Sequence, residues 1–168
     1  MKLLFAVLLA ALPLSASGQQ GRAGTAPSTG TAATAVPEST TKAEPSIYHA
    51  GAWEQEIGYA QALRVGNTIY VSGTGGADAK GNPADLESQM KVAYAGIRKT
   101  LAHFGAGLSN VVMERIYTTD MDALIKAQDT RKAIYGAWLP PATWTGVQRL
   151  YGKEDKIEIE VEARIDLR

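Results

Sequence analysis

Residues 156–167, KIEIEVEARIDL, constrain the fold more than any other part of this sequence. Aliphatic residues occupy every second position of the segment, and charged residues stand between them. A β-strand explains this alternation because its successive side chains point to opposite faces, whereas a helix would scatter the same aliphatic residues around its axis. We therefore expect a strand with one aliphatic face for a core and one acidic face for water or a functional site.

The first residues have the composition of a secretory signal peptide. Met1 and Lys2 precede an apolar run at 3–14, which is too short to span a bilayer, and small residues follow at 15–18. We assign residues 1–18 to a signal peptide with cleavage before Gln19. The alternative is a core helix or a membrane anchor. The prediction is an exported protein, periplasmic or secreted, with no membrane attachment once the signal is removed.

Residues 19–46 consist mainly of Ala, Thr, Ser, Gly and Pro, with almost no large apolar side chain. Such a segment buries too little surface to offset the entropy of ordering it, so we expect a disordered, low-complexity tether. A docking tail is the alternative, and the sequence does not separate the two. One folded domain remains, at residues 47–168.

Composition excludes several classes of site. The chain balances 17 Lys and Arg against 17 Asp and Glu, which gives no electrostatic basis for binding nucleic acid. It contains no cysteine, which excludes disulfides and thiolate chemistry. Its histidines, His49 and His103, are far apart in the sequence. We therefore expect neither a metal site nor a cofactor.

The folded region begins with a predicted β-hairpin. Two β-rich runs, at 59–65 and 68–72, flank a Gly66-Asn67 pair, and such a pair favours a tight turn between antiparallel strands. The glycine-rich residues 73–83 follow as a loop and contain no phosphate-binding motif.

Residues 85–104 carry apolar side chains at intervals of three and four, which predicts an amphipathic helix. Asp85 can cap its start, and Gly105 can end it with a positive φ. A strand is predicted at 110–118, followed by a helix that Asp120 or Asp122 caps and that runs to about Trp138. A further strand is predicted at 142–150. The turn at 151–155 should pair it with the terminal strand in an antiparallel hairpin.

This order of elements predicts an α+β fold with a mixed sheet. Two helices separated by a strand should pack on the same face of the sheet, because crossover connections are right-handed. The other face is then left uncovered, and it is half aliphatic. We therefore expect a homo-oligomer.

Four segments together resemble the RidA/YjgF family, whose members are also called endoribonuclease L-PSP-like. The segments are residues 57–73 (IGYAQALRVGNTIYVSG), 111–121, the Pro141-Ala142 pair and 156–160 (KIEIE). The resemblance implies a chorismate-mutase-like fold and a homotrimer with clefts between its subunits. It also implies hydrolysis of enamines and imines, such as 2-aminoacrylate, to a keto acid and ammonia.

The resemblance assigns catalytic roles to three residues. Tyr59 matches the cleft tyrosine of the family, Ser72 matches a serine at the end of the second hairpin strand, and Glu158 matches the glutamate that positions the attacking water. These roles are chemically reasonable, because a carboxylate on a rigid strand can order water and hydroxyls can carry a proton to nitrogen.

The family's Pro-Ala-Arg arginine, which binds the substrate carboxylate, is absent. Thr143 stands at its position, or Ala142 if the alignment slides by one residue. A neutral side chain cannot replace a bidentate contact to an anion. Arg115 or Arg149 could supply a relocated cation. Other departures from the family are Thr74 for a glutamine, Glu114-Arg115 for paired threonines and Arg131 for a helical tyrosine, which together indicate a kept scaffold and a rewritten pocket.

The sequence therefore predicts an exported RidA-like trimer that binds a small ligand in its clefts without the usual 2-aminoacrylate or imine deaminase activity. The alternative is an imine deaminase with a relocated cation, and a ribonuclease or translation inhibitor is third. The expected ligand-binding residues are Thr74, Arg115, Thr143, Thr145 and Trp144, of which Trp144 is either a stacking wall or part of the core. Glu160 and Glu162 are expected to pair with Lys or Arg across strands.

Overall fold

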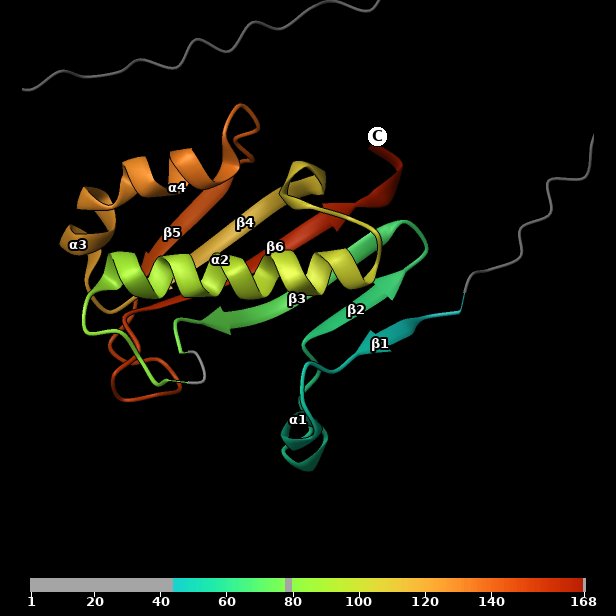
Figure 1. The fold of residues 1–168 in the computed structure, drawn as a ribbon, viewed down its shortest axis with the longest axis horizontal. Coiled ribbons are helices and arrows are strands. Elements are labelled where there is room, and N and C mark those ends of the chain that lie inside the picture. The colour runs from blue at the N-terminus through green and yellow to red at the C-terminus, as the bar shows by residue number, and fades with distance from the viewer. Residues whose placement is uncertain (1–43, 78–79, 168) are drawn as a thin grey trace, which may run out of the picture. The chain divides into compact units, whose positions relative to one another are not determined.

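The computed structural model describes residues 44–77 and 80–167 (Figure 1). The predicted signal peptide and all but the last three residues of the predicted tether lie outside these ranges. Within them, no helix is both long and apolar enough to cross a membrane.

One six-stranded sheet organises the described residues, in the order β1-β2-β3-β6-β4-β5. Residues 157–164 of the alternating segment form β6, which lies between β3 and β4 and pairs antiparallel with both. The predicted strand is three residues too long at its end, because Ile165–Leu167 form a 3-10 helix. The aliphatic side chains of β6 from Ile157 to Ala163 are at most 1% exposed, as the alternation predicts. The strands are β1 (Ser46–Tyr48), β2 (Ala62–Val65), β3 (Thr68–Gly75), β4 (Val111–Thr118), β5 (Ala142–Gly146) and β6 (Ile157–Arg164).

The predicted hairpin of β2 and β3 is confirmed, with Val65 opposite Thr68 across the turn. The predicted hairpin of β5 and β6 is wrong. β5 pairs in parallel with β4, from Glu114 opposite Ala142 to Thr118 opposite Gly146. Both edges of β6 are already occupied by β3 and β4, so no edge remains for β5. A helical crossover from β4 instead delivers β5 to the free edge of β4 in parallel orientation.

The predicted long helix is α2 (Leu86–His103). The Asp85 carboxylate accepts a hydrogen bond from the Ser88 N–H at 2.8 Å, and Gly105 adopts a φ of 73°. Both predicted end signals are therefore confirmed. The buried stripe of α2 includes Met90, Ala93, Ile97 and Leu101, which pack on the sheet.

The predicted second helix is broken into α3 (Met121–Lys126) and α4 (Gln128–Tyr135), which meet at Ala127. Asp120 caps α3 by accepting from the Ala123 N–H at 2.9 Å. The helix ends at Tyr135 and not near Trp138, because Gly136 turns the chain with a φ of 66°.

Figure 1 shows α2, α3 and α4 on the same side of the sheet, as predicted, and no described helix covers the other side. This other side is the open face, which carries the alternate side chains of β6, Glu158, Glu160 and Glu162. The helix α1 (Ala52–Glu56) follows β1 and was not predicted. Two short 3-10 helices complete the described elements, at Leu108–Asn110 and Ile165–Leu167.

A buried polar cluster ties α2 and α4 to β4. The Glu114 carboxylate is fully buried and accepts from the Tyr94 hydroxyl at 2.6 Å, the Tyr135 hydroxyl at 2.7 Å and the Arg131 Nε at 2.6 Å. Burial is the largest influence on Tyr94 and Tyr135 and raises the pKa of both phenols, so both remain donors. Glu114 and Arg131 are therefore parts of the helix–sheet interface, and their assignment to a rewritten pocket is wrong.

Candidate functional site

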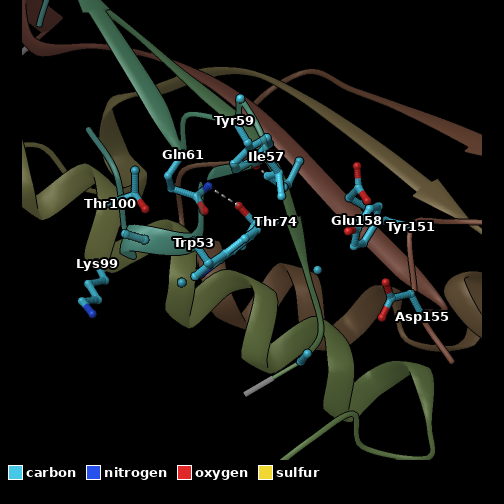
Figure 2. Close-up of a pocket in the computed structure, with 16 residues that line it drawn as sticks. Trp53, Ile57, Tyr59, Gln61, Thr74, Lys99, Thr100, Tyr151, Asp155 and Glu158 are labelled. Carbon is cyan, nitrogen blue, oxygen red and sulfur yellow. Dashed lines mark hydrogen bonds between the residues drawn. The ribbon is translucent and has the colours of Figure 1, made fainter. Parts of the chain in front are cut away.

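A pocket of about 670 Å³ lies at the end of β3, where residues 73–75 extend past the last residue pair with β2 (Figure 2). Its walls come from α1 and the segment after it, from β3, from α2 and from the loop before β6. Glu158 of β6 also lines the pocket, and the other lining residues include Trp53, Ile57, Tyr59, Gln61, Thr74, Lys99, Tyr151 and Asp155.

An irregularity in β3 places Glu158 in the pocket. The register between β3 and β6 shifts between Val71 and Thr74, and beyond the shift Gly75 pairs with Glu158. A Cβ atom on Gly73 would clash with the Glu158 Oε1 atom. The bulge and its glycine therefore let the carboxylate rest directly against the β3 backbone.

The predicted tyrosine and serine lie at the same bulge. The Tyr59 hydroxyl donates to the Gly73 carbonyl at 2.8 Å, and the Ser72 hydroxyl donates to the Ala60 carbonyl at 2.8 Å. Burial raises the pKa of the Tyr59 phenol, against a smaller lowering by the Ser72 side chain. The structure thus gathers Tyr59, Ser72 and Glu158 around Gly73, and Tyr59 and Glu158 also line the pocket.

The Glu158 carboxyl lies in an unfavourable setting for negative charge. It is half-buried, and burial is the largest of the effects that raise its pKa, followed by the negative charges of Glu160 and Asp155. A carboxyl of this kind takes up a proton more readily than an exposed glutamate and is better matched to accepting one from water near neutral pH.

Thr74 lines the opposite, helix-facing side of the pocket. Its hydroxyl donates to the Ser72 carbonyl and accepts from the Gln61 Nε2, each at 3.1 Å. Its methyl group faces α2, because a Cβ on Gly96 would lie 3.0 Å from it. The pocket therefore reaches around the β3 edge, from Glu158 on the open face to Thr74 and α2 on the helix-covered face.

The wall before β6 is a loop held in place by polar contacts. Gln89 on α2 accepts from the Lys156 N–H at 2.7 Å and donates to the Glu154 carbonyl at 2.9 Å. The Asp155 carboxylate accepts from the Asn82 Nδ2 at 2.6 Å and from the Gly152 N–H at 2.7 Å. These bonds fix the loop that presents Asp155 and Tyr151 to the pocket.

Thr143, Thr145 and Arg115 lie outside this pocket. Thr143 and Thr145 are exposed on β5, and Thr143 is the register partner of Arg115. The Arg115 guanidinium is 2.9 Å from Glu162 and 4.0 Å from Glu160, so the predicted cross-strand pairing of these two glutamates is confirmed.

Trp144, between these threonines, packs against the hydrophobic core, which agrees with the core alternative and not with the stacking wall. Arg149 is exposed and does not line the pocket either.

Several lining residues were not predicted. Trp53 and Tyr59 stack with ring centroids 6.1 Å apart and an interplanar angle of 11°. Trp53, Ile57 and Tyr151 are 55%, 56% and 83% exposed, an unusual concentration of exposed apolar side chains around one pocket. Helix α1 has only five residues, too few for a periodic pattern. The only available signal was the presence of large apolar residues in segments that otherwise resemble loops.

Within the described ranges, no three His, Asp or Glu side chains come together as a possible metal site. Lys99 on α2 is the one Lys or Arg among the described residues that line the pocket.

Comparison with known proteins places this geometry in a family. The sequence model of the family described as Endoribonuclease L-PSP matches residues 50–165. A 2-iminobutanoate/2-iminopropanoate deaminase of Dermatophagoides farinae is 29% identical over 110 residues, covering 63% of this chain and 85% of the deaminase.

Two solved structures are similar along most of their length. Rv2704 of Mycobacterium tuberculosis, a member of the YjgF/YER057c/UK114 family, has a TM-score of 0.66 and 28% identity, covering 73% of this chain and 100% of that one. RidA from an Antarctic Psychrobacter has a TM-score of 0.60 and 27% identity, covering 64% and 88%. The fold, the matched segments and the family model agree, and the chain belongs to the YjgF/RidA family of endoribonuclease L-PSP-like proteins.

Proposed function

We propose that this protein is an exported homotrimer of the RidA family that binds a small ligand in its pocket and lacks the usual 2-aminoacrylate or imine deaminase activity. The observation that carries the proposal is the charge at the arginine position. Thr143 is neutral, and its neighbour Arg115 is already paired with Glu162 and Glu160. Among the described residues that line the pocket with Glu158, Lys99 on α2 is the one cation, and it lies on the helix-covered side, away from Glu158 (Figure 2).

The rest of the family's site is retained in part. Tyr59, Ser72 and Glu158 gather around Gly73, and Glu158 has the raised pKa that suits a group handling water. The pocket therefore keeps groups for binding and proton transfer while lacking the contact that selects α-imino acids.

Assembly and export rest on separate observations. The open face exposes Val65 and Tyr70 (43% and 46%), apolar surface that a second copy of the chain can bury. Export rests on the sequence pattern of residues 1–18. Analytical ultracentrifugation of the purified protein and N-terminal sequencing of protein recovered after secretion test these two parts of the proposal.

The deaminase question is tested by generating 2-aminoacrylate or an imine in situ and measuring ammonia release. We expect the wild type to match buffer alone. Ammonia release well above buffer that disappears in Glu158→Ala would contradict the proposal. Thr143 lies outside the pocket of its own subunit. In a trimer whose clefts lie between subunits, Thr143→Arg supplies the family's guanidinium from a neighbouring copy and should raise turnover above buffer. Ala133→Arg is the control, since it adds the same charge at an exposed residue of α4, on the helix-covered side of the sheet.

Deaminase activity with a relocated cation is the second candidate, because Lys99 lines the pocket. On this hypothesis the wild type releases ammonia, and Lys99→Met abolishes the release. Lys91→Met is the control, because Lys91 lies on the same helix but pairs with Glu87 at 2.7 Å. The family description also prompts a ribonuclease assay. We expect no cleavage of RNA, because the charge balance gives no electrostatic attraction to a polyanion.

A further inference from the structure

The Glu158 end of the pocket contains a carboxylate that no described residue neutralises. Among residues 44–77 and 80–167, no group donates a hydrogen bond or forms an ion pair with the Glu158 side chain, although the residue is half-buried. The other carboxylate of the pocket differs, since both oxygens of Asp155 accept hydrogen bonds from its own loop or from Asn82. Glu158 is therefore the carboxylate that is available to a ligand.

The basic residue of the pocket is at its other end. Lys99 extends from α2 on the helix-covered side, together with Thr74, whereas Glu158 projects from the open face of β6. Figure 2 shows Lys99 and Glu158 on opposite sides of the pocket, with Trp53 and Thr74 between them. The charge near Glu158 is thus negative, with Asp155 adding to it.

Aromatic rings complete this end of the pocket. Tyr59 stacks on Trp53, and its hydroxyl is held by the Gly73 carbonyl next to Glu158. Tyr151 stands exposed on the facing loop. Faces of aromatic rings attract cations, and a nearby carboxylate adds a charge-assisted hydrogen bond for an ammonium group.

We propose that the pocket takes an organic cation, a protonated amine or iminium compound with an apolar body and no carboxylate beside its nitrogen. The nitrogen lies against Glu158, and the apolar body lies against Trp53, Ile57 and Tyr59. This inference rests on the proposed small-ligand function and specifies that the ligand is positively charged. A carboxylate in the same place would face Glu158 with no described cation to offset the repulsion.

A matched set of probes tests the proposal on the full chain: benzylamine, benzyl alcohol and benzoate, which share a ring and differ in charge. Binding is measured by calorimetry and by the fluorescence of Trp53 in a Trp138→Phe, Trp144→Phe background. We expect benzylamine to bind about tenfold or more tightly than benzoate, the scale of one charge-assisted hydrogen bond. Its affinity should rise with pH as Glu158 ionises.

The variants separate the possible outcomes. Glu158→Gln should reduce benzylamine affinity to that of benzyl alcohol, while Glu160→Gln, the next acidic residue on the same face, should leave the preference intact. Benzoate binding as tightly as benzylamine, or an unchanged preference in Glu158→Gln, would overturn the inference and leave the proposed function standing. Failure of all three probes to bind would contradict the proposed function and the inference together.

Discussion

Glu114 and Arg115 are neighbours on β4, and the two faces of the sheet put their charges in opposite settings. The Glu114 side chain is 0% exposed and meets Arg131 and two tyrosine hydroxyls beneath α2 and α4. The Arg115 side chain is 39% exposed and meets Glu160 and Glu162 on the open face. Both are ion pairs across secondary-structure elements, so they differ chiefly in access to water.

This difference determines what each pair contributes. In the buried cluster, desolvation is costly, and the charges persist because every one has a partner. Removing one partner leaves the other charge buried and unpaired. On the open face, water replaces any lost partner, so the same loss matters little to a single chain. Two ion pairs of similar geometry therefore contribute very differently to the stability of a single chain.

The largest expected effect is from Glu114→Gln. The variant leaves the Arg131 guanidinium buried without a counter-charge, so we expect the free energy of unfolding to fall by about 3–5 kcal/mol. Urea denaturation measures the change. Glu162→Gln, which removes a carboxylate from the open face, is the control. If both variants lower the free energy of unfolding equally, the two faces of the sheet do not differ in how ion pairs contribute to stability.

A double variant sharpens this result. Glu114→Gln with Arg131→Met removes both buried charges, so its destabilisation should be smaller than the sum of the two single losses by about 0.5–3 kcal/mol. The remaining loss would report the tyrosine hydrogen bonds and packing. If the losses in the free energy of unfolding of the two single variants add up to the loss of the double variant, the two side chains do not act as a pair.

Arg115→Gln should change the stability of one chain by about 0–1 kcal/mol, and added salt should reduce the difference further. If three copies bury the open face, the same variant should affect assembly more than folding. Sedimentation at a series of protein concentrations separates the two effects. A loss as large as that of Glu114→Gln at low concentration would contradict the prediction.

The smallest expected effect is the pH dependence that Glu158 gives to the stability of the protein. Burial, with Glu160 and Asp155, raises the pKa of Glu158 in the folded protein. Its contribution to stability is therefore present below the unfolded carboxyl pKa and is lost as pH rises through the folded value. Glu158→Gln should gain stability relative to the wild type as pH rises from about 4, the ordinary glutamate pKa, into the neutral range. A difference that stays constant across this range would contradict the raised pKa.

Local patterns predicted most of the helices and strands themselves, but not which strands pair with β6. The alternation at 156–167 predicted β6, and Asp85 and Gly105 marked the ends of α2. The error at β5 has a physical cause. The turn at 151–155 looked sufficient for a hairpin, but pairing depends on which strand edges remain free, and that depends on β3 and β4, which are distant in sequence.

The site was predictable only in part, for the same reason. The family resemblance pointed to Tyr59, Ser72 and Glu158, but the bulge that brings them to Gly73 is a property of two paired strands. Glu114 and Arg131 stood out separately as departures from the family. Their role in the core becomes visible only when α4 is placed over β4.

The central position of β6 also bears on the order in which the chain can fold. Of the six strands described, it is the last to leave the ribosome, and it alone joins β1-β2-β3 to β4-β5. Until translation reaches it, these two groups share no hydrogen-bonded ladder, and the inner edges of β3 and β4 stay open. Completion of the core is therefore a late step, which a growing polypeptide cannot take by folding its N-terminal part first.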